Sequence, residues 1–148
     1  MLLNTKKKTM KKTKFLLLAS SLLFIVLLGC SEDNPTEPPP STAVSSKLSD
    51  IQAKVFTQSC ALSGCHGPTN NQANLLLTDG NSFSNLVNIQ SLLFPQFERV
   101  VPDSSSKSLL IKILKGEVSP RMPLNRDPLS AAVIDSIAKW INNGALNN

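Results

Sequence analysis

The sequence of 148 residues has no tyrosine, one tryptophan, one histidine and three cysteines. One cysteine belongs to the N-terminal segment described below. The remaining three Cys and His side chains do not complete a structural zinc site, which usually requires four. The part of the chain expected to fold has only five aromatic side chains. A small core this poor in large side chains usually needs a disulfide, a metal or another cross-link.

Negative charge is missing from the start of the chain, where the first fourteen residues contain six lysines and no acid. The formal net charge of +5 depends on this segment, since the rest of the chain has nine cations against ten acids. The basic charge is therefore not evidence of a nucleic-acid-binding surface, and we expect no nucleic-acid partner. The six lysines are Lys6, Lys7, Lys8, Lys11, Lys12 and Lys14.

An apolar run of fourteen residues, 15–28, follows the basic segment. This order is typical of a secretory signal, and the run is shorter than the about 18 residues of a transmembrane helix. The residues Leu27-Leu28-Gly29-Cys30 resemble the bacterial lipobox. The resemblance implies that residues 1–29 are a lipoprotein signal peptide and that Cys30 is lipidated, which anchors the chain stably.

Residues 30–46 are rich in Ser, Pro, Thr and Glu and contain few side chains able to enter a core. That composition is typical of a disordered tether. We therefore expect one folded domain over 47–148. The tether would link it to the lipid of a bacterial outer-membrane lipoprotein, on the periplasmic or the outward-facing side.

The apolar spacing within 47–148 predicts short helices, and no run alternates long enough to build a sheet, so the expected fold class is mainly α. Ser49 is the expected N-cap of a helix over Asp50–Phe56 that runs up to the first cysteine of the domain. Asn81 or Ser82 is expected to start a second short helix. The segment Leu75–Leu77 is consistent with a short strand.

Two further helices are expected towards the C-terminus. Ser104 or Ser105 caps a helix that Gly116 ends, and Asp127 caps the last helix, which has Pro128 in its first turn and ends at Gly144. The long loops between these helices are uncommon in a compact domain unless a ligand organises them. The side chains expected to face the core are Ile51, Val55, Phe56, Phe83, Leu86, Val87, Leu109, Leu110, Ile113, Leu114, Leu129, Val133, Ile134, Ile137, Trp140 and Ile141.

Scarce residue types gather in the segment Cys60-Ala61-Leu62-Ser63-Gly64-Cys65-His66-Gly67. Cys-x2-Cys-His is the signature of covalent haem attachment, in which two thiols add to the haem vinyl groups and the next His ligates the iron. Here four residues separate the cysteines, and Gly64 eases the turn by which the additional residues loop out. The alternative is a structural disulfide between Cys60 and Cys65, with His66 as a chance neighbour.

Four parts of the domain together resemble a class I cytochrome c domain, in the variant form of secreted and lipid-anchored proteins of environmental bacteria. They are the helix before Cys60, the C-x4-C-H-G segment, the Arg121-Met122-Pro123 loop and the closing helix 137–145. The resemblance extends over Leu48–Ala145 and implies a small fold of short helices and long loops around one covalent haem c. Arg121 is either a partner of a haem propionate or a solvated loop charge.

The resemblance also implies the roles of the site residues. Cys60 and Cys65 are the thioether positions, while His66 and Met122 are the proximal and distal ligands of the iron. A lone Met is also a common core filler, which is the alternative for Met122. A proline carbonyl accepts the imidazole proton in such domains, and the candidates are Pro68 and Pro102.

Iron held by a His nitrogen and a Met sulfur is closed to substrates and moves single electrons. We therefore expect a lipid-anchored monohaem c-type cytochrome, an electron carrier and not an enzyme. We also expect it to be monomeric, to contact the membrane through its lipid and to exchange electrons with redox proteins outside the cytoplasm. One alternative is a non-redox, disulfide-stapled lipoprotein domain for binding or cell-surface structure. Another is a haem enzyme or gas sensor, if Met122 does not ligate. A two-haem peroxidase is not supported, because the chain has one Cys-His motif.

Overall fold

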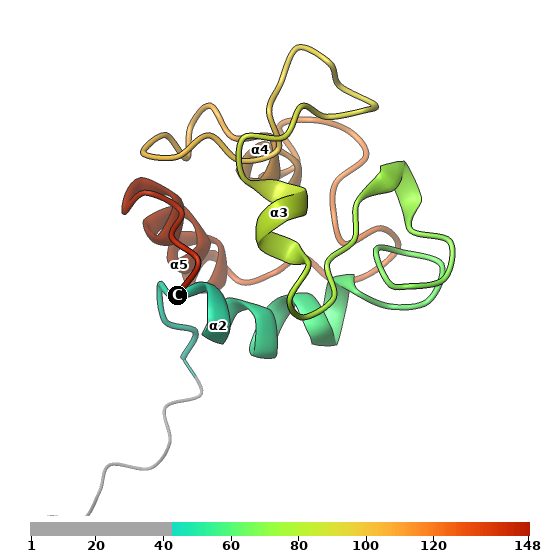
Figure 1. Cartoon of the computed structure of the whole chain (residues 1–148), viewed down its shortest axis with the longest axis horizontal. Helices are drawn as coiled ribbons and strands as arrows, with labels where there is room; N and C mark the ends of the chain where they lie inside the picture. The colour runs from blue at the N-terminus through green and yellow to red at the C-terminus, as the bar shows by residue number, and fades with distance from the viewer. Residues whose placement is uncertain (1–42) are drawn as a thin grey trace, which may run out of the picture. The chain divides into compact units, whose positions relative to one another are not determined.

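The computed structural model describes residues 43–148, whose arrangement Figure 1 shows. The predicted signal peptide, Cys30 and the tether up to residue 42 lie outside the described residues. Residues 43–148 are mainly helical, as predicted, and contain no β-strand but two isolated β-bridges. The elements are α2 (Leu48–Ile51), the π-helix η1 (Gln52–Cys60), the 3-10 helix η2 (Gln72–Asn74), α3 (Ser82–Leu86), α4 (Leu109–Lys115) and α5 (Ala131–Asn142).

The first helix is formed by α2 and η1 without a break and begins at Leu48. The predicted cap at Ser49 is wrong, because Ser49 lies inside the first turn. Asn148, from the other end of the chain, accepts the free amides: Leu48 N donates to its Oδ1 at 2.9 Å, and Ser49 N donates to its backbone oxygen at 2.8 Å. Such contacts replace a capping side chain. The predicted inward face is confirmed by the burial of Ile51, Val55 and Phe56.

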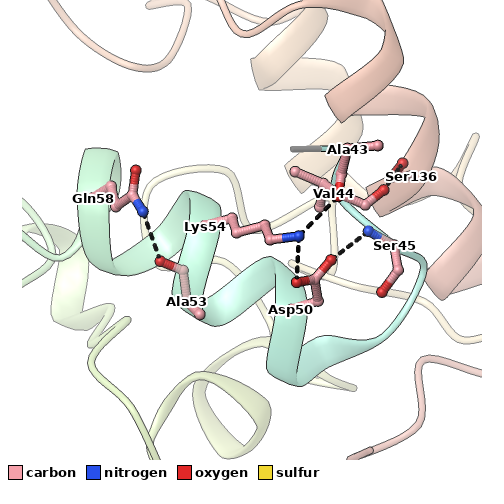
Figure 2. Close-up of polar contacts among 8 residues, drawn as sticks. All are labelled: Ala43, Val44, Ser45, Asp50, Ala53, Lys54, Gln58 and Ser136. Carbon is pink, nitrogen blue, oxygen red and sulfur yellow. Dashed lines mark hydrogen bonds and ion pairs between the residues drawn. The ribbon is translucent and has the colours of Figure 1, made fainter. Parts of the chain in front are cut away.

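The helix is wide from Gln52 to Cys60, with the i→i+5 bonding of a π-helix. Two side-chain contacts follow the same spacing. Gln52 Nε2 donates to Thr57 Oγ1 at 3.0 Å, and Gln58 Nε2 donates to the Ala53 carbonyl at 3.2 Å (Figure 2). In an ordinary α-helix the neighbours along a face are three and four residues apart. The wide helix ends at Cys60, so it determines where the first thiol of the motif lies.

Helix α4 begins after Ser108 and not after the predicted caps Ser104 or Ser105. The Ser108 hydroxyl is fully buried, where it donates to the Ser104 carbonyl at 2.9 Å and accepts from Val101 N at 2.9 Å. It therefore holds the preceding turn against the helix, an arrangement that the local sequence does not show. The helix ends at Gly116, as predicted.

Helix α5 begins after Ser130, whose Oγ accepts from Val133 N at 3.4 Å. The predicted cap Asp127 is wrong, because the helix starts later and Pro128 precedes it. The helix ends just before the predicted stop at Gly144. Most of its predicted apolar stripe is confirmed by the burial of Ile134, Ile137, Trp140 and Ile141, whereas Val133 is only partly buried and Leu129 precedes the helix.

The core lies where α2, η1, α4 and α5 meet. In Figure 1, α5 lies beside α2, and α3 and α4 lie above the first helix in the view; α4 and α5 also contact one another. The predicted strand Leu75–Leu77 is wrong, because no segment within 43–148 pairs with it as a strand; Leu77 is nevertheless buried. No helix within 43–148 is long and apolar enough to cross a membrane.

The residues that enter the domain are bound to it from Ala43 onwards (Figure 2). Lys54 Nζ lies 2.9 Å from both the Ala43 carbonyl and the Asp50 carboxylate, and Asp50 accepts from Ser45 N. Ser136 Oγ on α5 donates to the Val44 carbonyl at 2.7 Å. The contacts of the domain therefore begin before the predicted boundary at residue 47.

Candidate functional site

A cavity lies between η1, α4 and the loops around them. Its volume is about 200 Å³, or about 1240 Å³ when the open space at its mouth is included. Its wall is mostly aliphatic and aromatic, and the charged side chains among the described residues that line it are Arg99 and Arg126. No carboxylate of residues 43–148 lines it. The cavity therefore suits a largely apolar ligand with negative groups.

The four residues singled out in the sequence, Cys60, Cys65, His66 and Met122, all line this cavity. Arg121, a candidate partner for a propionate, does not line it. Its Nη2 donates to the Arg126 carbonyl at 3.2 Å, and its Nη1 is buried with no hydrogen-bond partner among the described residues. Sequence reasoning did not identify the arginines that do line the cavity.

The additional residues between the two cysteines form a turn. Cys65 N donates to the Leu62 carbonyl at 3.0 Å, and His66 N donates to the Cys60 carbonyl at 3.0 Å. Gly64 has a φ of +78°, which favours glycine. The turn therefore takes up the longer spacing, and the backbone of His66 stays bonded to that of Cys60.

Gly67 is required by close packing of the same turn. A Cβ at this position would lie 2.7 Å from the carbonyl oxygens of both Ala61 and Leu62. These are backbone atoms, which cannot move aside as the end of a flexible side chain can. Close packing in this turn therefore explains why a glycine follows His66, which the sequence pattern alone does not show.

The two thiols of the site are free and differ in exposure: Cys60 is partly buried and Cys65 is exposed. Burial, with a smaller contribution from Cys65, raises the pKa of the Cys60 thiol to about 11. The Cys60 thiol is therefore protonated at neutral pH unless a ligand or enzyme activates it. Since they line one cavity, both can bond to a single ligand within it.

The imidazole of His66 is held by backbone groups. Its Nδ1 lies 3.2 Å from the carbonyl oxygen of Gln72, so the carbonyl that contacts the ring belongs neither to Pro68 nor to Pro102. Burial lowers the pKa of His66 most strongly, backbone contacts oppose this change, and the charge of Arg99 lowers it further. A neutral ring that donates from Nδ1 has Nε2 as its free lone pair, the form that ligates a metal.

Met122 lies on the loop between α4 and α5, where its backbone N donates to the Ile113 carbonyl at 3.1 Å. This bond attaches the loop to α4. The side chain is half-buried, packs against the core and lines the same cavity as His66. The structure therefore brings a thioether sulfur and an imidazole to one apolar space, although they are far apart in the sequence.

No protein-family model, curated protein or solved structure matches this chain. Within residues 43–148, no three His, Cys, Asp or Glu side chains are grouped so that they could hold a metal ion. The residues of the cavity do fit a covalent haem. Two thiols, one imidazole and one thioether match its attachment points and axial ligands, and two arginines match its carboxylates.

Proposed function

We propose that this protein is a lipid-anchored c-type cytochrome that transfers single electrons between redox proteins outside the cytoplasm. One observation carries the proposal: Cys60, Cys65, His66 and Met122 line one apolar cavity whose charged lining residues, within 43–148, are both cationic. A disulfide-stapled binding domain would not require His66 and Met122 to share a space with the thiols.

Each residue then has a defined role. Cys60 and Cys65 would hold a haem through thioethers, and His66 Nε2 and the Met122 sulfur would ligate its iron. A bound haem would supply a one-electron couple, whose potential Met ligation raises. With both ligands supplied by the protein, the iron would offer no open place to a substrate, which fits a carrier and not an enzyme.

The rim of the cavity offers a contact surface for redox partners. Leu93 and Leu124 line the cavity and are 66% and 54% exposed. Exposed leucines beside the opening would allow a partner to approach the edge of the haem across a small apolar contact. Electron-transfer encounters are usually small and transient, so this surface suits several successive partners.

The lipid on Cys30 would hold the domain near an outer-membrane surface, periplasmic or outward-facing. Residues 31–42 separate Cys30 from Ala43, the first of the described residues. Twelve residues span at most about 40 Å, so the domain would work within this distance of the lipid. Partners would then be membrane proteins or carriers that reach the same surface.

The test is a pyridine haemochrome spectrum with acid–acetone extraction, on the full chain expressed in a host that matures c-type cytochromes. We expect haem that stays with the protein and a c-type band. The variants C60S and C65S should each give the band of a single thioether, and H66A should lose the low-spin spectrum. A colourless, folded protein with oxidised thiols would show that the disulfide-stapled domain is correct instead.

A further inference from the structure

Arg99 is a buried cation without a carboxylate partner among the described residues. Its side chain is 8% exposed, and it takes part in neither of the ion pairs within 43–148. Instead its guanidinium donates to three backbone carbonyls. Nη1 lies 2.7 Å from the oxygen of Asn85, and Nη2 lies 2.8 Å from that of Ala73 and 3.2 Å from that of Asn74. Burying a charge in this way is costly, which calls for a functional reason.

Two of these carbonyls belong to η2, the turn that holds His66. The Gln72 carbonyl of this turn contacts His66 Nδ1, and Gln72 N donates to the Cys65 carbonyl at 2.7 Å. Ala73 and Asn74 have φ values of +58° and +52°, the left-handed region that Ala rarely adopts. The turn therefore needs contacts from outside itself to keep this conformation, and Arg99 supplies them.

The other end of Arg99 is attached to rigid parts of the domain. Its carbonyl accepts from Leu110 N on α4 at 3.0 Å, and its backbone N donates to the Ile89 carbonyl at 2.7 Å. The residue thus connects α4 and the end of α3, through Asn85, to the turn beside His66. Its planar fork suits contacts with carbonyls from two segments, whereas a lysine has one ammonium on a flexible stem.

We propose that Arg99 is a positioning residue for His66. Its guanidinium holds η2, and η2 in turn holds the imidazole through the Gln72 carbonyl. The consequence at the iron rests on the proposed function, since it requires His66 to be the proximal ligand. The action on the turn itself does not require haem. Mutation of a group that orients a ligating His typically lowers metal affinity or activity by about 10- to 100-fold.

The first part of the test measures amide hydrogen exchange on the full purified chain. The probe is the Leu77 amide, which donates to the His66 carbonyl at 2.8 Å. R99M should accelerate its exchange about tenfold or more, because three charge-assisted bonds to backbone are lost. R99K keeps the charge and should also accelerate exchange at Leu77. It takes the place of R99M in the test if R99M does not fold. The control K107M removes an exposed cation that does not line the cavity and should leave this exchange unchanged.

The second part compares the low-spin ferric EPR spectra of the same proteins. R99K and R99M should show an additional low-spin component, because His66 then takes more than one orientation, while K107M keeps a single component. The proposal is wrong if R99K matches the wild type in exchange, or if exchange accelerates while the EPR spectrum is unchanged. A colourless protein would contradict the proposed function alone, and exchange at Leu77 would then decide whether Arg99 holds the turn.

Discussion

The two sides of the first helix differ in how they are closed. Towards α5, the core is closed by packing: Ile51, Ile137 and Ile141 are 0% exposed. Towards α4 and the loop that carries Met122, a cavity remains, and several of the apolar side chains that line it are only partly buried: Leu75, Leu110, Met122 and Leu129. Leaving apolar surface open to water is unfavourable, so the second side is organised for a ligand, while the first side is complete by itself.

The largest expected effect is on the packed side. Trp140 is 1% exposed, and its Nε1 donates to the Leu146 carbonyl at 2.8 Å. W140A should lower the free energy of unfolding by about 3–5 kcal/mol, because it leaves a large void in a closed core. Denaturant unfolding followed by circular dichroism measures the change. L93A, on the cavity rim, is the control and should stay within about 0.5 kcal/mol of the wild type.

A smaller effect is expected where the turn of the motif is most tightly packed. G67A places a Cβ against two carbonyl oxygens, so the turn must shift, at a cost of about 1–3 kcal/mol. Covalent haem content per mole of protein should fall with it, since the shift moves Cys65 and His66 relative to Cys60. Haem content equal to that of the wild type would show that the turn has more freedom than the packing implies.

The effect of M122A on stability should be smaller still, about 1 kcal/mol, because the side chain is half-buried. The covalent haem should be kept, its potential should fall and the reduced protein should bind carbon monoxide, since the distal position is open. Optical titration with carbon monoxide measures this, with the wild type as the protein that does not bind. An unchanged spectrum would remove Met122 from the ligands and favour the haem enzyme or gas sensor.

The smallest effect is expected at the polar contacts that hold residues 43–45 to the first helix. The backbone N of Ser45, and then Lys54, hold the pKa of Asp50 below its usual value. This carboxylate therefore contributes stability above pH 4, which is lost as the pH falls through its lowered pKa. D50N should cost about 0.5 kcal/mol at pH 7 and nothing at pH 2, as measured by denaturant unfolding at both values. A difference that persists at pH 2 would mean that the charge is not the cause.

The helices could be predicted because apolar spacing is a local property. The buried faces of α5 and of the first helix follow from it, as do the stops near Gly116 and Gly144. The start of the first helix could not, because Asn148, which bonds its first turn, is distant in the chain. Helices α4 and α5 begin after Ser108 and Ser130, which the local sequence does not distinguish from the nearby predicted caps.

The same distinction applies to the cavity. Cys60, Cys65 and His66 are contiguous enough for the sequence to identify, and Met122 follows from the resemblance of its loop. Arg99 could not be found in this way, because its carbonyl partners come from two segments far from it in the chain. Contacts with backbone atoms depend on the path of the chain and not on the residue types that make it.

The most direct test of the account is mass spectrometry of the tryptic peptide Val55–Arg99 from the purified full chain. This peptide contains Cys60, Cys65 and His66 but neither Met122 nor Cys30. We expect it to carry one haem and no free thiol. A peptide without haem, with its two cysteines free or joined in a disulfide, would contradict the claim that this cavity holds a covalent haem.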